Sequence, residues 1–419
     1  MPSDTENDTE KDAPSFPAQT PDPDASRTEQ KTKDILEACR WRDVAALTSL
    51  AESRRGLLDD ELRRRAFDFS ILLLMADERL TGLLHEDLGP ILLGLPSSDR
   101  RGDACGGDWK DLPCHRDEHQ IQLDVDRSFI YYPNDQSQAE LAQRKSELSA
   151  VIIQVLRRHP YLCYFQGFHD ICQVFILVLG PDQRSAEVVE RLSVLRIRDF
   201  MLPTLGPTTT QLRLLPDILA RADPEMRRHV AFIEPFYALA GTLTMYAHNI
   251  EDYHDIARLF DVFLAREPVF SIYIFAQILM DRRREILEID EADMLQVILA
   301  KVPAKMDLDD LISKTVALFD RHPPHTLSSW SAISSASVLK TVRDVGALVD
   351  QTLDQGHVYF EQQVKEVWWS DLADGAKMTI RRYRRPIAVV AVAVGVAAVA
   401  VLLRRKQNWL QRILSSFQT

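Results

Sequence analysis

Glycine is scarce in this chain, with only 15 among its 419 residues. Phosphate-binding loops need closely spaced glycines, because backbone amides must approach the phosphate groups. The sequence contains no Walker A loop. We therefore expect that the chain has no glycine-rich nucleotide-binding architecture and hydrolyses no nucleotide by itself.

Cysteine is also infrequent, and the apolar core region of a secretory signal is missing at the N-terminus. An odd number of scattered cysteines indicates free thiols in a reducing, cytosolic compartment. Cys105, Cys114 and His115 lie close together in the sequence, but no second pair completes four zinc ligands. We therefore expect no metal site. The five cysteines are Cys39, Cys105, Cys114, Cys163 and Cys172.

The chain has no excess of positive charge, since its formal net charge is −12. Nucleic-acid-binding domains usually present a basic face, whereas basic and acidic residues are mixed here until the C-terminal region. We therefore expect no nucleic-acid partner. Residues 1–33 are rich in Asp, Glu, Pro, Ser and Thr and nearly free of large apolar residues. Such a composition predicts a disordered acidic tail.

Alternating strand patterns are absent as well, and apolar residues recur at helical spacing over residues 34–321. This pattern predicts an all-α, multi-helix domain that begins with a lead-in helix. Two apolar runs, residues 171–180 and 268–280, are each shorter than about 15 residues, too short to cross a bilayer core of about 30 Å. We expect both to be buried core helices.

A stretch rich in proline and serine, residues 322–337, predicts the exit from this domain. We expect residues 322–380 to form a linker and a juxtamembrane helix, the helix running from about Val338 to Trp369. The prediction that the chain enters a membrane comes from the apolar run at residues 387–403.

Residues 387–403 read IAVVAVAVGVAAVAVLL and contain no polar or charged side chain. A helix of this length spans about 25 Å, which suits a thin membrane such as the endoplasmic reticulum. A buried helix of a soluble domain would normally carry a polar face. We therefore expect a single C-terminal transmembrane anchor, inserted after synthesis, that leaves the upstream chain in the cytosol. Residues 404–419 are either a short basic amphipathic helix at the interface or a poorly ordered stub.

The first motif with a chemical implication is Ile121-x-x-Asp124-x-x-Arg127. On a helix, Asp124 and Arg127 are three residues apart and share one face. The carboxylate can therefore hold the planar, permanently charged guanidinium in one pose and leave part of it free for a partner. Taken alone, such a pair is usually a surface salt bridge worth about 0–1 kcal/mol.

The second motif is Tyr164-Phe165-Gln166-Gly167-Phe168-His169-Asp170. Gln166 stands at a helix entrance and offers one acceptor and two donors without charge, which suits it to orienting a water molecule. Taken alone, it would be a buried glutamine that caps backbone groups. His169 and Asp170 could form a general base of a membrane hydrolase, but no nucleophile motif accompanies them, so a structural pair is favoured.

Together and in this order, the two motifs resemble the signature pair of the TBC-domain family of Rab GTPase-activating proteins. Two further segments resemble the opening and late motifs of that family, and the resemblance extends over about Arg55 to Arg321. With the anchor, it is strongest to the branch held in the endoplasmic reticulum. The two segments are Arg55-Gly56-Leu57 with Leu62-Arg63, and the run RLFDVFL from Arg258 to Leu264.

The sequence departs from the family pattern in three places. Leu58 stands where the family usually has proline, and Phe67 replaces the usual tryptophan. After Arg127, residues 128–133 (SFIYYP) replace the common Thr-Phe-Pro. None of these changes removes a residue of the two signature motifs.

The resemblance implies an activator of GTP hydrolysis rather than an enzyme with its own substrate. Arg127 and Gln166 would act in trans, the first neutralising charge on the phosphoryl group and the second orienting water in place of the partner's own glutamine. Asp124 would brace Arg127, with Tyr164 and Gly167 as supporting residues.

The implied partner is a Rab-family GTPase in its GTP form. That partner holds the nucleotide and magnesium, so the chain needs no cofactor. The implied place is the cytosolic face of the endoplasmic reticulum, where the protein would regulate traffic to the Golgi. The alternative is a catalytically silent Rab-binding tether on the same membrane.

Overall fold

The computed structural model describes residues 23–67, 108–133, 136–181, 183–343, 347 and 351–373. Within these ranges the chain forms helices and turns and no strand, which confirms the expected all-α class. The α-helices are α1 (Pro23–Trp41), α2 (Val44–Glu52), α3 (Asp60–Phe67), α4 (Glu118–Val125), α5 (Gln138–Arg158), α6 (Phe168–Leu179), α7 (Gln183–Arg191), α8 (Gly206–Leu212), α9 (Leu214–Ala222), α10 (Pro224–His229), α11 (Leu239–Leu243), α12 (Tyr253–Ala265), α13 (Phe270–Asp281), α14 (Arg283–Leu287), α15 (Ala292–Ala300), α16 (Leu308–Arg321), α17 (Val338–Thr341) and an unlabelled helix over residues 353–373.

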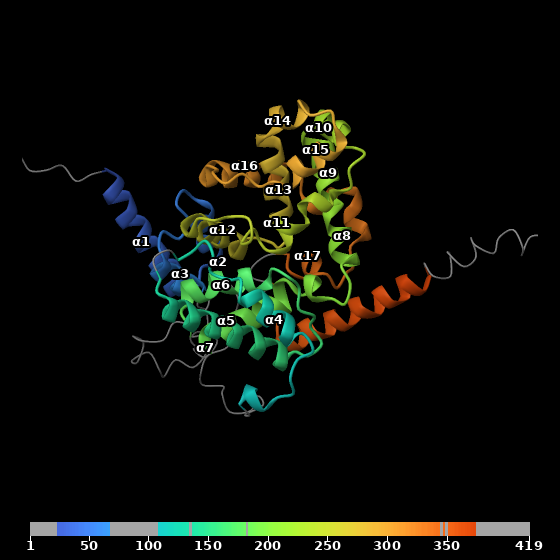
Figure 1. The fold of residues 1–419 in the computed structure, drawn as a ribbon. Helices are drawn as coiled ribbons and strands as arrows, with labels where there is room; N and C mark the ends of the chain where they lie inside the picture. Colours follow the sequence, from blue (N-terminus) through green and yellow to red (C-terminus); the bar gives the residue numbers. More distant parts are fainter. Residues whose placement is uncertain are drawn as a thin grey trace, which may run out of the picture.

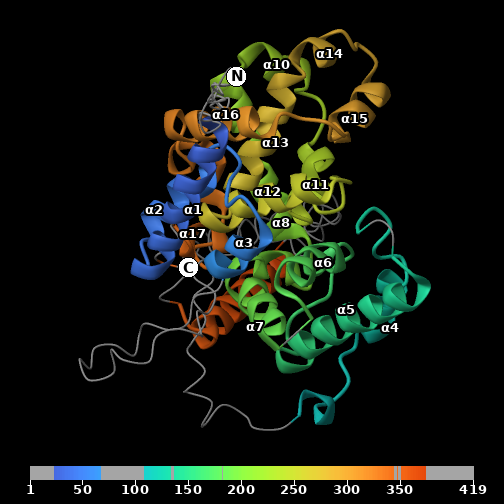
Figure 2. The ribbon, with the colours of Figure 1, turned by 90° about the vertical axis from the view of Figure 1, so that its left-hand side faces the viewer.

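Short helical turns complete the path. The turns are η2 (Trp109–Asp111), η3 (Leu192–Arg196), η4 (Arg198–Met201), η5 (Pro235–Ala238), η6 (Pro324–Thr326) and η7 (Ser328–Ala332). Figures 1 and 2 show α4–α7 gathered in one part of the molecule and α9, α10 and α13–α15 in another. Helix α12 contacts α6 and α16, and α16 contacts α13, so these helices connect the two parts.

Capping residues determine where several of these helices begin. Asp43 at α2 and Asp252 at α12 each accept a hydrogen bond from a backbone N–H in the first turn. Helix α5 begins with a capping box, in which Ser137 and Glu140 bond each other's backbone N–H. These contacts satisfy donors that have no partner within the helix.

Two apolar helices lie at the centre of the packing. Ten of the twelve residues of α6 are buried, and ten of the twelve of α13. The prediction that residues 171–180 and 268–280 are core helices is thus confirmed. Among the described residues no helix combines the length and apolarity needed to cross a membrane. The predicted anchor, residues 387–403, and the tail, residues 404–419, lie outside the described residues.

A buried ionic cluster joins the opening segment to the late segment of the domain. Asp261 on α12 is fully buried and accepts hydrogen bonds from Arg63 Nε at 2.8 Å and from the Leu57 amide at 3.0 Å. Arg258 donates to Asp309 at 3.1 Å and to the Ala51 carbonyl at 2.7 Å. The two motifs, about 200 residues apart in the sequence, therefore lie in contact.

The charge state of this cluster follows from its partners. Burial lowers the pKa of Arg63, but the carboxylates of Asp261 and Asp60 together raise it above its ordinary value. Burial also raises the pKa of Asp261, and the Arg63 guanidinium opposes that shift. A buried pair of this kind is strongly destabilised when one partner is removed, because the remaining charge stays buried.

The departures from the family pattern at Leu58 and Phe67 are accommodated locally. Leu58 has φ +69°, a conformation that proline cannot adopt because its ring fixes φ near −65°. Phe67 is fully buried, and its ring centroid lies 6.4 Å from that of Phe175. An aromatic side chain therefore still fills the core at the position where the family has tryptophan.

The predicted disorder of residues 1–33 is wrong from Pro23 onward, because α1 begins there. Composition misses the contacts that this helix makes. Lys31 Nζ donates to Ser53 Oγ at 2.7 Å and to the Arg54 carbonyl at 2.6 Å, and Ile35 is fully buried. The lead-in helix is thus longer than expected.

The predicted exit from the domain at residues 322–337 is also wrong. Leu327, Ile333 and Val338 are buried despite the surrounding serines and prolines. The single helix expected from Val338 to Trp369 is interrupted, because residues 342–343 and 351–352 lie between α17 and the helix over residues 353–373 and are not helical. The chain therefore continues to pack on the domain for about forty residues beyond α16.

We predict that Gly56→Ala lowers the free energy of unfolding. Gly56 has φ +52°, and an added Cβ would lie 2.4 Å from Asp261 Oδ2. A left-handed backbone alone costs an alanine about 1–2 kcal/mol, and displacing the buried carboxylate adds to that cost. Chemical denaturation measures the change. Gly206→Ala is the control, since its nearest contact would be an ordinary 3.6 Å; equal stability of the two variants would contradict the prediction.

Candidate functional site

The predicted site is built around the carboxylate of Asp124, which is fully buried at the end of α4. Its Oδ1 accepts hydrogen bonds from Arg127 Nη2 at 2.6 Å and from Gln120 Nε2 at 3.0 Å. Its Oδ2 accepts one from the Tyr164 hydroxyl at 3.0 Å. A buried carboxylate needs such partners, so Asp124 connects the first motif to the second.

Arg127 lies just after the end of α4, and its side chain faces solvent. Its side chain is 63% exposed although its partner Asp124 is buried. Nη2 is held by Asp124, and Nε donates to the Leu123 carbonyl at 3.2 Å. The guanidinium is therefore fixed on one side and open to solvent on the other.

Tyr164 connects Asp124, which holds Arg127, to the loop that carries Gln166. Burial raises the pKa of Tyr164, and the neighbouring Asp124 carboxylate raises it further. The phenol therefore stays protonated and available as a donor. The Tyr164 amide also donates to Asp117 Oδ2 at 3.0 Å, which fixes the loop to the start of α4.

Gln166 is exposed and stands immediately before Gly167, the N-cap of α6. Gly167 has φ +101°, and an added Cβ would lie 2.5 Å from Thr244 Cγ2. Only glycine meets both conditions. The backbone at Gln166 is thus positioned by close packing against a residue that follows α11.

His169 and Asp170 pair as expected, with Nε2 and Oδ1 3.2 Å apart. His169 Nδ1 lies 3.1 Å from the Tyr164 hydroxyl. Burial lowers the pKa of His169, with the carboxylates of Asp170 and Asp124 opposing the shift. The histidine therefore serves as a neutral part of the network that begins at Asp124.

Three contributors to this site were not predicted from the sequence: Gln120, Thr244 and His248. His248 Nδ1 lies 3.0 Å from Asp170 Oδ2, and this hydrogen bond raises the pKa of His248. Gln120 could have been found from its spacing, since it is four residues before Asp124 on the same helix. The other two lie about 80 residues from their partners and carry no local signal.

Residues 128–133, which depart from the family pattern, place some of their side chains in the core and others at the surface. Phe129, with φ +60°, donates its amide to Gln173 Oε1 at 2.9 Å, and Phe129 and Tyr132 are buried. Ile130 is 70% exposed and Tyr131 44% exposed. Apolar side chains therefore face solvent three and four residues after Arg127 in the chain.

The residues considered for zinc have other partners where the structure describes them. His115 Nε2 lies 3.1 Å from the Leu162 carbonyl, and Arg157 donates to Cys114 Sγ at 3.4 Å. Cys105 lies outside the described residues.

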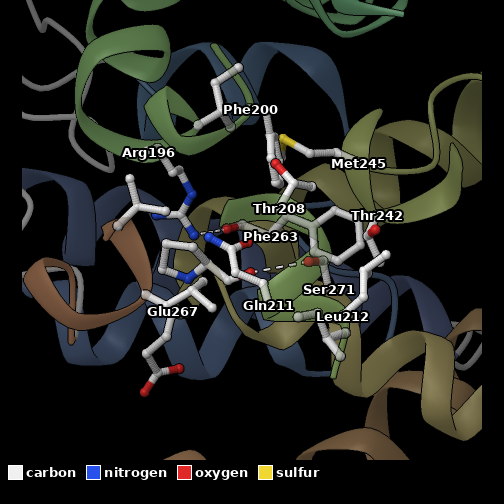
Figure 3. Close-up of a pocket in the computed structure, with 15 residues that line it drawn as sticks. Arg196, Phe200, Thr208, Gln211, Leu212, Thr242, Met245, Phe263, Glu267 and Ser271 are labelled. Atoms are coloured by element: carbon white, nitrogen blue, oxygen red, sulfur yellow. Dashed lines mark hydrogen bonds between the residues drawn. The ribbon is translucent and has the colours of Figure 1, made fainter. Parts of the chain in front are cut away.

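A cavity lies away from these residues, between α8, α13 and α17 (Figure 3). Arg196 is buried in its wall and donates to the backbone carbonyls of Phe263 and Arg266. None of the five predicted site residues lines this cavity. The candidate site is therefore the exposed surface around Arg127 and Gln166.

We predict that Tyr164→Phe lowers the free energy of unfolding by about 1–3 kcal/mol, the usual cost of leaving a buried polar group with fewer partners. The variant removes the hydroxyl that contacts Asp124 and His169. Denaturant titration measures the change. Tyr131→Phe is the matched control, because that ring is 44% exposed; the prediction fails if both variants are equally stable.

Comparison with known proteins adds to the geometry. Residues 96–287 match the Rab-GTPase-TBC domain. The TBC1 domain family member 20 of Bos taurus is 32% identical over 73% of this chain and 71% of its own length. The GTPase-activating protein gyp10 of Schizosaccharomyces pombe is 30% identical over 70% of this chain and 82% of its own length.

A solved structure, described as the Ypt/Rab-GAP domain of Gyp1p, is similar over 49% of this chain and 73% of its own, with 17% identity and a TM-score of 0.42. By its matched domain and by its sequence identity to these two relatives, this chain belongs to the Rab-GTPase-TBC domain family.

Proposed function

We propose that this chain activates GTP hydrolysis by a Rab-type GTPase and supplies Arg127 and Gln166 to the partner's active site. The observation that supports this proposal best is the contrast within the Asp124 pair. The carboxylate is fully buried, whereas the arginine that it holds is 63% exposed. A surface salt bridge would not need a buried brace.

Arg127 would stabilise the charge that develops on the transferred phosphoryl group. An arginine finger must be planar, charged and positioned in advance. Asp124 occupies one edge of the guanidinium and leaves the other for phosphate oxygens. Such a finger typically accelerates hydrolysis by about 10³–10⁵-fold.

Gln166 would orient the attacking water. Its loop is attached to the same carboxylate through Tyr164 and is fixed behind by Gly167 against Thr244. The two fingers thus share one support, so they would enter the partner's site together. GTP and magnesium would belong to the partner, and the chain would need no cofactor of its own.

Exposed apolar side chains beside Arg127 would contribute contact area. Leu123, Ile130 and Tyr131 are each at least 44% exposed. Apolar and aromatic residues around a charged centre are typical of protein interfaces. Residues 128–133, which depart from the family pattern, therefore lie where the choice of partner would be made.

We predict that Arg127→Ala reduces the acceleration by about 10³-fold or more, the usual effect of removing an arginine finger. Single-turnover GTP hydrolysis by a panel of purified Rab proteins, with and without the full chain, measures it. Arg284→Ala is the matched control, because Arg284 is also exposed and paired with an acidic neighbour. Folding of both variants should match that of the parent chain.

The competing hypothesis is a tether that binds a GTPase without accelerating it. It predicts no acceleration by the unaltered chain and unchanged binding by Arg127→Ala. Full acceleration by Arg127→Ala would also contradict our proposal.

We further propose that residues 387–403 anchor the chain in a membrane, with the domain in the cytosol, and that the endoplasmic reticulum is that membrane. The support is the uninterrupted apolar run and its limited length, which suits a thin bilayer. At that location the activator would act on GTPases of traffic from the endoplasmic reticulum to the Golgi.

We predict that the full chain, expressed in cells, stays with the membrane pellet after carbonate extraction. A variant that lacks residues 387–403 should move to the supernatant, because no other apolar run of that length occurs in the sequence. Recovery of both forms in the pellet, or of both in the supernatant, contradicts the anchor.

A further inference from the structure

The helix over residues 353–373 has one face packed on the domain and one end beyond it. Its buried residues, Gly356, Phe360 and Gln363, recur at spacings of three and four, as expected for one face of a helix. This face extends no further than Val367, which is half-buried. The last six residues, 368–373, are all exposed.

Close contacts hold the packed part of this helix. Gln363 is 1% exposed and donates to the buried Asp199 at 2.9 Å. An added Cβ at Gly356 would lie 2.5 Å from Val194 Cγ1, so helix and domain meet without space between them. The guanidinium of Arg198 lies 5.2 Å from the ring of Tyr359.

The same helix also contacts the segment that leads to Gln166. The ring of His357 stacks on Tyr161 with centroids 4.0 Å apart, and Phe360 lies 4.9 Å from Tyr161. Two residues after Tyr161, the Cys163 amide donates to the Met201 carbonyl on η4, which also carries Asp199. The direction of the helix is therefore fixed relative to the loop that carries Gln166.

The exposed end carries three large apolar side chains. Trp368 is 57% exposed, Trp369 61% and Leu372 52%. Figure 1 shows the orange-red end of this helix extending past the neighbouring helices. One charged residue, Asp371, lies among these six residues. An exposed apolar patch of this kind marks an interaction surface.

We propose that Trp368, Trp369 and Leu372 bind the lipid surface of the membrane that holds the anchor, and so fix how the domain is oriented on it. This inference rests on the anchor proposed above. The patch ends at Leu372, and fourteen residues, 373–386, separate it from the apolar run that begins at Ile387. Fourteen residues reach at most about 50 Å when extended and about 21 Å as a helix.

Side-chain chemistry favours lipid over another protein surface. Tryptophan is enriched where a membrane meets water, since its ring is apolar and its N–H is polar. Four arginines, at positions 381, 382, 384 and 385, follow the patch and precede the run. Basic residues next to a membrane span are attracted to anionic headgroups. The patch, the arginines and the apolar run thus follow one another along the chain. This is the order expected for a segment that runs from the surface of a bilayer into its interior.

A lipid contact at the end of this helix would also fix the orientation of Arg127 and Gln166. The helix is clamped to the domain through Gln363 and Tyr161, so a bilayer contact at its end restricts the rotation of the whole domain. Arg127 and Gln166 would then face a membrane-attached GTPase at a fixed angle. A flexible tether alone would not impose this orientation.

Quenching of tryptophan fluorescence by brominated lipid tests the contact. The full chain is reconstituted in phosphatidylcholine–phosphatidylserine vesicles with bromine on the acyl chains. Trp409→Phe serves as the background, because Trp409 follows the anchor. Of the five tryptophans that remain from six, Trp368 and Trp369 should be quenched, a loss of up to about two fifths of the emission. Adding Trp368→Phe and Trp369→Phe to the background should abolish the quenching.

Trp41→Phe in the same background is the control, since Trp41 is 68% exposed and lies on α1, far from this helix in Figure 1. The emission lost to quenching should be the same as in the background, and it would amount to up to about half of the emission of the four remaining tryptophans. Equal quenching with and without Trp368 and Trp369 overturns the lipid contact. Shielding of the two rings from aqueous acrylamide without quenching by brominated lipid also overturns it and indicates a second copy of the chain.

Flotation of the same vesicles separates this inference from the anchor. A chain that floats but shows no quenching at Trp368 and Trp369 retains the anchor and loses the lipid contact. A chain that does not float rejects both.

Discussion

The carboxylate of Asp124 determines how the site is built. It is fully buried and must satisfy its oxygens within the protein. One oxygen holds the guanidinium of Arg127, and the other holds the hydroxyl of Tyr164. A single group therefore sets the position of an exposed arginine and of the loop that presents Gln166. Gly167 against Thr244 completes the support from the opposite side.

Arg63 and Arg127 are both paired with buried carboxylates, but they differ in exposure. The side chain of Arg63 is 5% exposed and donates to both Asp261 and Asp60, so it joins parts of the fold. The side chain of Arg127 is 63% exposed and uses one edge for its carboxylate. The first arrangement stabilises the domain, whereas the second leaves a charged group exposed at the surface.

Much of this arrangement could be predicted from short-range patterns. The spacing of Asp124 and Arg127 on one helix face, and the glycine after Gln166, are local features that sequence displays directly. The all-α class follows from helical periodicity. The contact between Tyr164 and Asp124 joins residues forty apart, and that between His248 and Asp170 joins residues 78 apart. No local pattern specifies such pairs.

Composition was misleading at both ends of the domain. The contacts of Lys31 and Ile35 stabilise a helix in a segment whose acidic and polar composition predicts disorder. A few contacts with the domain thus outweigh the low average hydrophobicity of the segment. Leu327 and Val338 bury a segment whose serines and prolines suggested an exit. That burial continues to Gln363 and gives the helix before the apolar run a fixed place on the domain.

The most direct measurement uses a Rab GTPase whose own catalytic glutamine has been replaced by leucine. If the shared support delivers both fingers, the unaltered chain still accelerates single-turnover GTP hydrolysis by this GTPase. Gln166→Ala should then abolish the acceleration, because Gln166 would supply the carboxamide that orients the water in place of the GTPase's own. No acceleration by the unaltered chain, or full acceleration by Gln166→Ala, would contradict the account.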